Sequence, residues 1–135
     1  MIVDPTPARK AFMDLGCCSQ AVLRAGLELD GIESEITVKA AGGLCGGMEM
    51  GYVCGALSGA ICAIGALVSE DDRAEIVKDI AEWFEEVYGK QYGSINCIDI
   101  SHEDDAIREK ICPGIVEDTY VKLVEVLAAH GYEYD

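Results

Sequence analysis

The feature that most constrains the fold of this chain is residues 50–69, which contain no charged side chain. An apolar segment of this kind is stable only where it is shielded from water. Its length approaches the roughly 20 residues that span a bilayer. However, it is rich in Gly, Ala, Ser and Cys, contains no Lys or Arg to orient it, and has acidic residues on both sides, at Glu49 and at 70–72. We therefore expect a buried helix of a soluble protein and no membrane-spanning segment.

The remaining sequence indicates helices separated by short loops, with no internal repeat and no alternating stretch long enough for a sheet. Proline at first-turn positions and glycine at helix ends suggest the boundaries. The expected helices cover about residues 5–15, 18–29, 34–41, 52–68, 69–89, 101–110 and 112–130. The predicted fold is all-α: a compact single-domain bundle of about five to seven helices over residues 1–135. A glycine-rich loop, residues 42–51, precedes a central helix of small residues.

The net charge of −15 comes from 25 acidic and 10 basic residues. This charge argues against binding to nucleic acid or to an anionic membrane surface. A solvated acidic surface and a surface that steers a basic partner protein both remain open. The first residues lack a basic region followed by an apolar stretch, so we expect a cytoplasmic location, where structural disulfides are disfavoured.

Seven cysteines are present, an odd number that fits metal ligation or redox work better than a disulfide scaffold. On the predicted layout Cys18, Cys54 and Cys112 lie at or near helix starts, where unpaired N–H groups and the helix dipole favour a thiolate. Cys97 lies in a Gly/Ser-punctuated turn shortly before Cys112. These four residues form a candidate four-sulfur site, because helix starts and glycine loops supply N–H donors to cluster thiolates and sulfides.

The other three cysteines receive different interpretations. We expect Cys62, on the small-residue helix, to be a core residue, since buried cysteine behaves as a small hydrophobe. Cys17 would point about 100° away from Cys18 on a helix, so the two are not expected to bind one metal ion together. Cys45, in the glycine-rich loop, is a candidate substitute ligand or resolving thiol.

Spacing alone leaves the chemistry open between metal or cluster ligation, reversible dithiol chemistry and structural thiols. No Cys-x-x-Cys is present, which excludes a zinc-ribbon knuckle, a thioredoxin-type dithiol and a bacterial ferredoxin run. The Cys-x-x-Cys-His attachment site of covalent haem is also absent.

Five short segments nevertheless follow one another in a specific order: Cys18-Ser19-Gln20-Ala21-Val22, Gly46-Gly47-Met48, Cys54-Gly55-Ala56-Leu57-Ser58-Gly59, Gly93-Ser94-Ile95-Asn96-Cys97 and Cys112. In this order they resemble the C_GCAxxG_C_C family of redox-active proteins, from about Gly16 to the last helix. The resemblance implies a small redox-active domain whose four recurring cysteines correspond to Cys18, Cys54, Cys97 and Cys112.

The family is similar to part of the split-Soret cytochromes, in which a four-cysteine site is associated with a [2Fe–2S] cluster. Some members are encoded near transporter genes, which suggests a functional link to a transporter. Two features depart from these relatives. The missing haem attachment site means that covalent haem is not expected, and Cys45 stands where a glycine or another small residue would be usual.

These observations combine into one leading hypothesis with two alternatives. The leading hypothesis is an iron–sulfur protein for electron transfer or redox sensing, with Cys18, Cys54, Cys97 and Cys112 as ligands. [2Fe–2S] is favoured and [4Fe–4S] remains open. Leu57, Ile61 and Trp83 would supply apolar cover. The alternatives are a cluster-free dithiol/disulfide oxidoreductase with Cys54 as the redox thiolate, and a soft-metal-binding accessory protein of a transporter. The redox partner is expected to be another protein, and a homodimer remains open.

Overall fold

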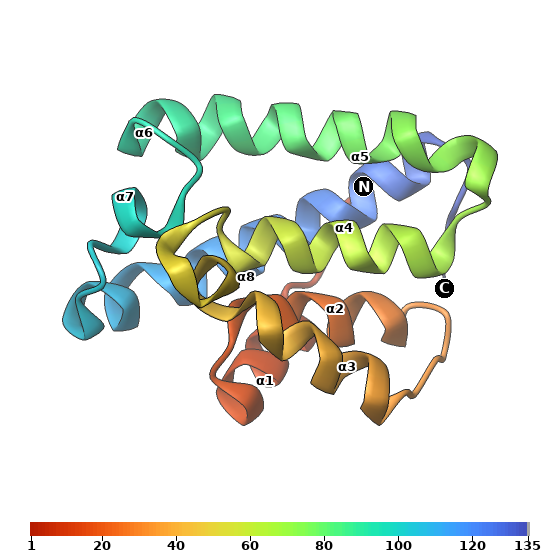
Figure 1. Cartoon of the computed structure of the whole chain (residues 1–135). Helices are drawn as coiled ribbons and strands as arrows, with labels where there is room; N and C mark the ends of the chain where they lie inside the picture. The colour runs from red at the N-terminus through yellow and green to blue at the C-terminus, as the bar shows by residue number, and fades with distance from the viewer. Residues whose placement is uncertain (135) are drawn as a thin grey trace.

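The computed structural model describes residues 1–134, and within them the fold is helical, as the sequence predicts. Figure 1 shows the arrangement of the helices. In chain order the elements are α1 (Thr6–Leu15), α2 (Cys18–Glu28), α3 (Glu35–Ala41), η1 (Gly42–Leu44), η2 (Gly47–Gly51), α4 (Gly55–Leu67), α5 (Glu70–Phe84), η3 (Glu85–Gly89), α6 (Lys90–Tyr92), α7 (Cys97–Ser101) and α8 (Asp105–Ala129). Val53 and Asn96 form an isolated antiparallel β-bridge between the segments that precede α4 and α7.

The uncharged segment forms α4, which packs against α2, α5 and α8. Its buried face consists mostly of glycine and alanine together with Leu57 and Ile64. Small side chains allow the backbones of neighbouring helices to approach closely, and apolar residues of α2, α5 and α8 complete the core around them. Within residues 1–134, no helix combines the length and the apolar character needed to cross a membrane.

The contact between α2 and α4 depends on two glycines of α4. A Cβ atom at Gly59 would overlap the carbonyl oxygen of Ser19 and lie 2.8 Å from its Cα. A Cβ at Gly55 would lie 3.1 Å from the backbone nitrogen of Ser19. These glycines are therefore required because the start of α2 lies directly on α4.

The C-terminal part of the fold differs from the sequence prediction. Two helices, 101–110 and 112–130, were expected there, but Ser101 instead ends α7, and one helix, α8, runs from Asp105 to Ala129 across the expected break. Asp104 caps it, since its carboxylate accepts hydrogen bonds from the N–H groups of Ala106 (2.8 Å) and Ile107 (3.2 Å). Pro113 consequently lies inside the helix and not in its first turn. The missing N–H of this proline costs one helical hydrogen bond, while the buried face of α8 keeps the helix continuous.

The glycine-rich segment before α4 has a left-handed backbone. Gly46, Gly47, Met48 and Glu49 all have positive φ, and φ is 59° for Met48 and 57° for Glu49. Non-glycine residues reach this region only when the surrounding structure holds them there. In Figure 1 this segment lies at the end of α4 that faces α7. The turn therefore reverses the chain beside α7 before α4 begins.

We predict that Gly59→Ala destabilises the protein by about 1–3 kcal/mol, because the added methyl group overpacks the contact with Ser19. Gly65→Ala on the same helix is the matched control. No atom lies within 4 Å of a Cβ at that position, and alanine there should be neutral or stabilise the helix by about 0.5–1 kcal/mol. Urea unfolding followed by circular dichroism measures both. Equal stabilities of the two variants would contradict the proposed packing.

Candidate four-cysteine redox site

Backbone pairing brings Cys54 and Cys97 together. The N–H of Cys54 donates to the carbonyl of Ile95 (2.9 Å), and the N–H of Cys97 donates to the carbonyl of Tyr52 (2.7 Å). Cys54 is the N-cap of α4, and Cys97 is the first residue of α7. The two helices that begin with these cysteines are thus tied to each other at their starts, although more than forty positions separate them in the sequence.

The glycine contact between α4 and α2 brings in Cys18. A Cβ at Gly55, the residue after Cys54, would lie 3.4 Å from the Cβ of Cys18. Cys18 is the first residue of α2, as the sequence predicts. The tight packing of the Cys-Gly-Ala segment on α2 therefore also places Cys54 beside Cys18.

Cys112 is the fourth cysteine of the site and lies on α8. The sequence predicted that it lies at a helix start, and this prediction is wrong. It lies well inside α8, because this helix already begins at Asp105. Its sulfur interacts with that of Cys18 strongly enough to shift the pKa values of both thiols. Cys18, Cys97 and Cys112 line one cleft of about 670 Å³. Cys54 is 6% exposed, and its charge interacts with those of Cys97 and Cys112.

Two of these thiols hold their protons more strongly than an exposed cysteine does. The pKa of Cys54 is raised to about 12 by desolvation, although the N–H groups of Ala56 and Leu57 lie close enough to lower it in part without making full capping hydrogen bonds. The expectation that this helix start favours a thiolate is therefore wrong for the metal-free chain. The pKa of Cys18 is raised well above its ordinary value, first by Cys112, then by burial, then by the charges of the other cysteines.

Cys112 behaves in the opposite way. The pKa of its thiol is lowered, first by the interaction with Cys18 and further by the positive charge of Arg108, against the effect of partial burial. At neutral pH a larger fraction of Cys112 than of Cys54 is therefore present as thiolate. The hydrogen bond between the sulfurs of Cys18 and Cys112 favours ionisation of one thiol of the pair over ionisation of both.

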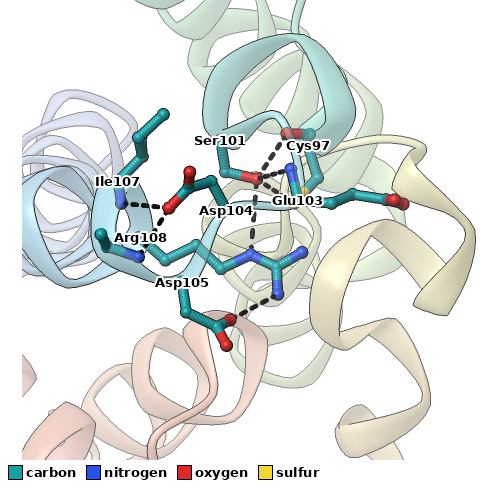
Figure 2. Close-up of polar contacts among 8 residues, drawn as sticks. Cys97, Ser101, Glu103, Asp104, Asp105, Ile107 and Arg108 are labelled. Atoms are coloured by element: carbon teal, nitrogen blue, oxygen red, sulfur yellow. Dashed lines mark hydrogen bonds and ion pairs between the residues drawn. The ribbon is translucent and has the colours of Figure 1, made fainter.

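Figure 2 shows how Arg108 is held near the site. Its Nε donates to the Ser101 hydroxyl oxygen (3.4 Å), and Nη1 lies 3.5 Å from a carboxylate oxygen of Asp105. The Ser101 hydroxyl donates to the carbonyl of Cys97 (2.9 Å) and lies 3.5 Å from the Cys97 sulfur. Sequence reasoning missed Arg108 and Ser101, because their contact depends on the left-handed turn between α7 and α8.

An aromatic cluster lies behind Cys54. Its centre is Tyr88, whose ring centroid is 5.0 Å from that of Phe84 and 6.0 Å from that of Trp83. Burial first, then Asp118, raises the pKa of Tyr88, and the charge of Cys54 adds a smaller effect. Of the residues expected to cover the site, Leu57 is buried, whereas Ile61 and Trp83 are half-buried against the core. Sequence reasoning did not single out Tyr88.

The remaining cysteines differ from their predicted roles. Cys17 and Cys45 form a disulfide with a Cα–Cα distance of 5.7 Å, although structural disulfides were not expected. While this bond is intact, the Cys45 sulfur cannot serve as a substitute ligand. Cys62 was expected in the core but is exposed. It lies on the face of α4 that is turned away from the buried glycines and alanines, one position before buried Ala63.

Comparison with known proteins bears on the chemistry of this arrangement. The family model described as "Putative redox-active protein (C_GCAxxG_C_C)" matches residues 16–126. The chain belongs to this family. No curated protein and no solved structure matched it. The match to the C_GCAxxG_C_C family includes all four cysteines of the site and ends within α8, so the resemblance seen in the sequence is confirmed.

The donor set of this C_GCAxxG_C_C protein suits some metal centres better than others. Four thiols are soft donors of the kind that bind iron–sulfur clusters, zinc and copper(I). Among residues 1–134, however, no group of three or more His, Cys, Asp or Glu side chains converges closely enough to hold a metal ion. The four sulfurs nevertheless interact electrostatically. By donor chemistry four cysteine thiolates fit an iron–sulfur cluster as well as a single soft cation.

We predict that the metal-free protein is alkylated at Cys112 much faster than at Cys54 near neutral pH. The pKa of Cys112 is lowered and its sulfur lines the cleft, whereas burial raises the pKa of Cys54 to about 12. Timed iodoacetamide labelling followed by peptide mass spectrometry gives the rate at each position. Exposed Cys62 serves as the internal reference. Equal rates at Cys54 and Cys112 would show that the electrostatic description is incorrect.

Proposed function

We propose that this protein binds an iron–sulfur cluster through Cys18, Cys54, Cys97 and Cys112 and uses it for electron transfer or redox sensing. Within this proposal [2Fe–2S] is favoured over [4Fe–4S]. Membership of a family described as redox-active supports the general class of function.

The observation that carries the proposal is the interaction of four free thiols from four separate segments, three of which line one cleft. Cys18 begins α2, Cys54 caps α4, Cys97 begins α7, and Cys112 lies within α8. The charge of each of the other three raises the pKa of Cys18. Without a cofactor such a set is unfavourable, because deprotonating a second thiol adds a like charge beside the first. Metal cations remove this penalty, since they bind thiolates.

The chain's own groups would support such a cofactor in two ways. The N–H groups of Ala56 and Leu57, with the charge of Arg108, offset negative charge at the sulfurs. Buried Leu57 and Tyr88 limit the access of water from the side of the core. A bound cluster would supply reversible one-electron transfer. Positive groups and N–H donors favour the reduced cluster, whereas burial disfavours its additional negative charge.

The first alternative, a cluster-free oxidoreductase with Cys54 as the attacking thiolate, receives less support. Cys54 is 6% exposed and the pKa of its thiol is about 12, so neither access nor ionisation suits nucleophilic attack. The second alternative, a soft-metal accessory protein of a transporter, would use the same thiols for zinc or copper. Metal analysis distinguishes it from the leading proposal.

The setting of the protein is also proposed and not established. We propose an electron-exchange partner that is another protein, a cytoplasmic location and a functional link to a transporter. The last of these depends only on the family resemblance. The acidic surface, with a net charge of −15, fits a partner that presents a basic face.

We predict that protein purified without oxygen contains stoichiometric iron and acid-labile sulfide and shows charge-transfer absorption in the visible range. Cys54→Ser should abolish or convert this absorption, because a proposed ligand is lost. Cys62→Ser is the matched control on the same helix, and its spectrum and iron content should equal those of the wild type. Zinc is measured on the same samples.

Two results would contradict this prediction. An unchanged spectrum and iron content in Cys54→Ser would remove Cys54 from the ligand set. Iron-free, colourless protein that also fails reconstitution would exclude the cluster proposal. In that case stoichiometric zinc would favour the soft-metal alternative.

A further inference from the structure

We propose that Cys17 and Cys45 form a second redox centre: a disulfide that a thiol reductant opens and closes reversibly from the cleft. Neither residue belongs to the four recurring cysteines of the family. The proposal stands on the position of this bond and does not require a cluster at Cys18, Cys54, Cys97 and Cys112.

The position of the disulfide makes it accessible from one side. Cys17 and Cys45 both line the cleft of about 670 Å³ that also contains Cys18, Cys97 and Cys112. Cys17 is 7% exposed, while Cys45 is more open to solvent. An incoming thiolate therefore reaches the Cys45 sulfur more easily, and the Cys17 sulfur is the leaving group.

Cys17 is the N-cap of α2, an eleven-residue helix. After the bond breaks, its buried sulfur takes up a proton and lies beside the Ser19 hydroxyl, 3.2 Å away.

Ser19 allows the buried site to accommodate both oxidation states. Its hydroxyl is fully buried, donates to the carbonyl of Ala41 (2.8 Å), and has its oxygen 3.2 Å from the Cys17 sulfur and 3.8 Å from the Cys45 sulfur. In the disulfide neither sulfur has a proton to donate. After reduction the Cys17 thiol can donate to the Ser19 oxygen. The Ser19 hydroxyl meanwhile keeps donating its own hydrogen bond to the Ala41 carbonyl. Reduction therefore leaves no buried donor without a partner.

The reaction is a thiol–disulfide exchange with a dithiol as the reductant. One thiolate of the dithiol bonds to the Cys45 sulfur, the Cys17–Cys45 bond breaks, and its electron pair leaves on the Cys17 sulfur, which takes up a proton. The second thiolate of the dithiol then attacks the first sulfur of the dithiol, which is bonded to Cys45 in the mixed disulfide. This step releases the Cys45 thiolate, which also takes up a proton. The protein gains two electrons and two protons, and the dithiol becomes a disulfide.

Reduction also has a structural consequence for the cleft. The disulfide joins the start of α2 to Cys45, directly before the left-handed segment that begins at Gly46. Opening the bond removes this covalent link between the glycine-rich segment and the helix that carries Cys18. The redox state of the pair thereby controls how firmly one wall of the cleft is held.

The test is a redox titration of the folded full-length protein. Samples are equilibrated without oxygen in glutathione buffers from reduced to oxidised, and in parallel in dithiothreitol, a model dithiol. Acid quenching, alkylation and peptide mass spectrometry then give the state of each cysteine, independently of any iron signal. We expect Cys17 and Cys45 to change together and reversibly, while Cys62 does not join this two-thiol transition.

Single-cysteine variants test the direction of attack. In Cys17→Ser, the free Cys45 should form a mixed disulfide with oxidised glutathione at least ten-fold faster than the free Cys17 does in Cys45→Ser. Ser19→Ala should shift the equilibrium several-fold toward the disulfide, because the reduced Cys17 loses its acceptor. Circular dichroism on each variant confirms that the comparison is made between folded proteins.

Two outcomes would overturn the proposal. In the first, Cys17 and Cys45 remain reduced in the most oxidising glutathione buffer. In the second, the disulfide resists dithiothreitol in the folded protein and opens only after denaturation, which would make it a structural crosslink. Reversible reduction of the folded protein by dithiothreitol supports the proposal.

Discussion

The site depends on the close contact between the starts of α2 and α4. Gly55 and Gly59 lie against the backbone of Ser19, at distances where a Cβ would be crowded or would overlap, and Gly55 also lies against the Cβ of Cys18. The contact sets where Cys54 lies relative to Cys18 and buries Ser19, which touches the disulfide. The same small residues that let the helices approach thus position two of the four thiols.

Electrostatics explains why such a site benefits from a bound cation. Burial and like charges raise the pKa values of Cys18 and Cys54, so the free thiols resist ionisation. Arg108, held by Ser101 and Asp105, lowers the pKa of Cys112 and is the nearby positive charge that the chain supplies. One basic side chain compensates for one thiolate, and the proposed cofactor would neutralise the others.

The sequence predicted the all-α class, the buried α4 and the helix starts at Cys18 and Cys54, because these follow from local composition and glycine punctuation. It failed where tertiary contacts decide. Pro113 suggested a helix start, but α8 begins at the Asp104 cap, and the packing of its buried face keeps it helical on both sides of Pro113. The pairing of Cys17 with Cys45 could not be inferred from spacing, since it requires the glycine-rich segment to return to the start of α2.

The most direct test of the central claim is X-ray absorption at the iron edge on protein purified without oxygen. We expect that sulfur alone surrounds the iron and that a second iron scatters at short range, as in a cluster held by four cysteines. Iron surrounded by oxygen or nitrogen atoms, without iron–iron scattering, would show adventitious metal and contradict the claim that the four cysteines form one cluster site.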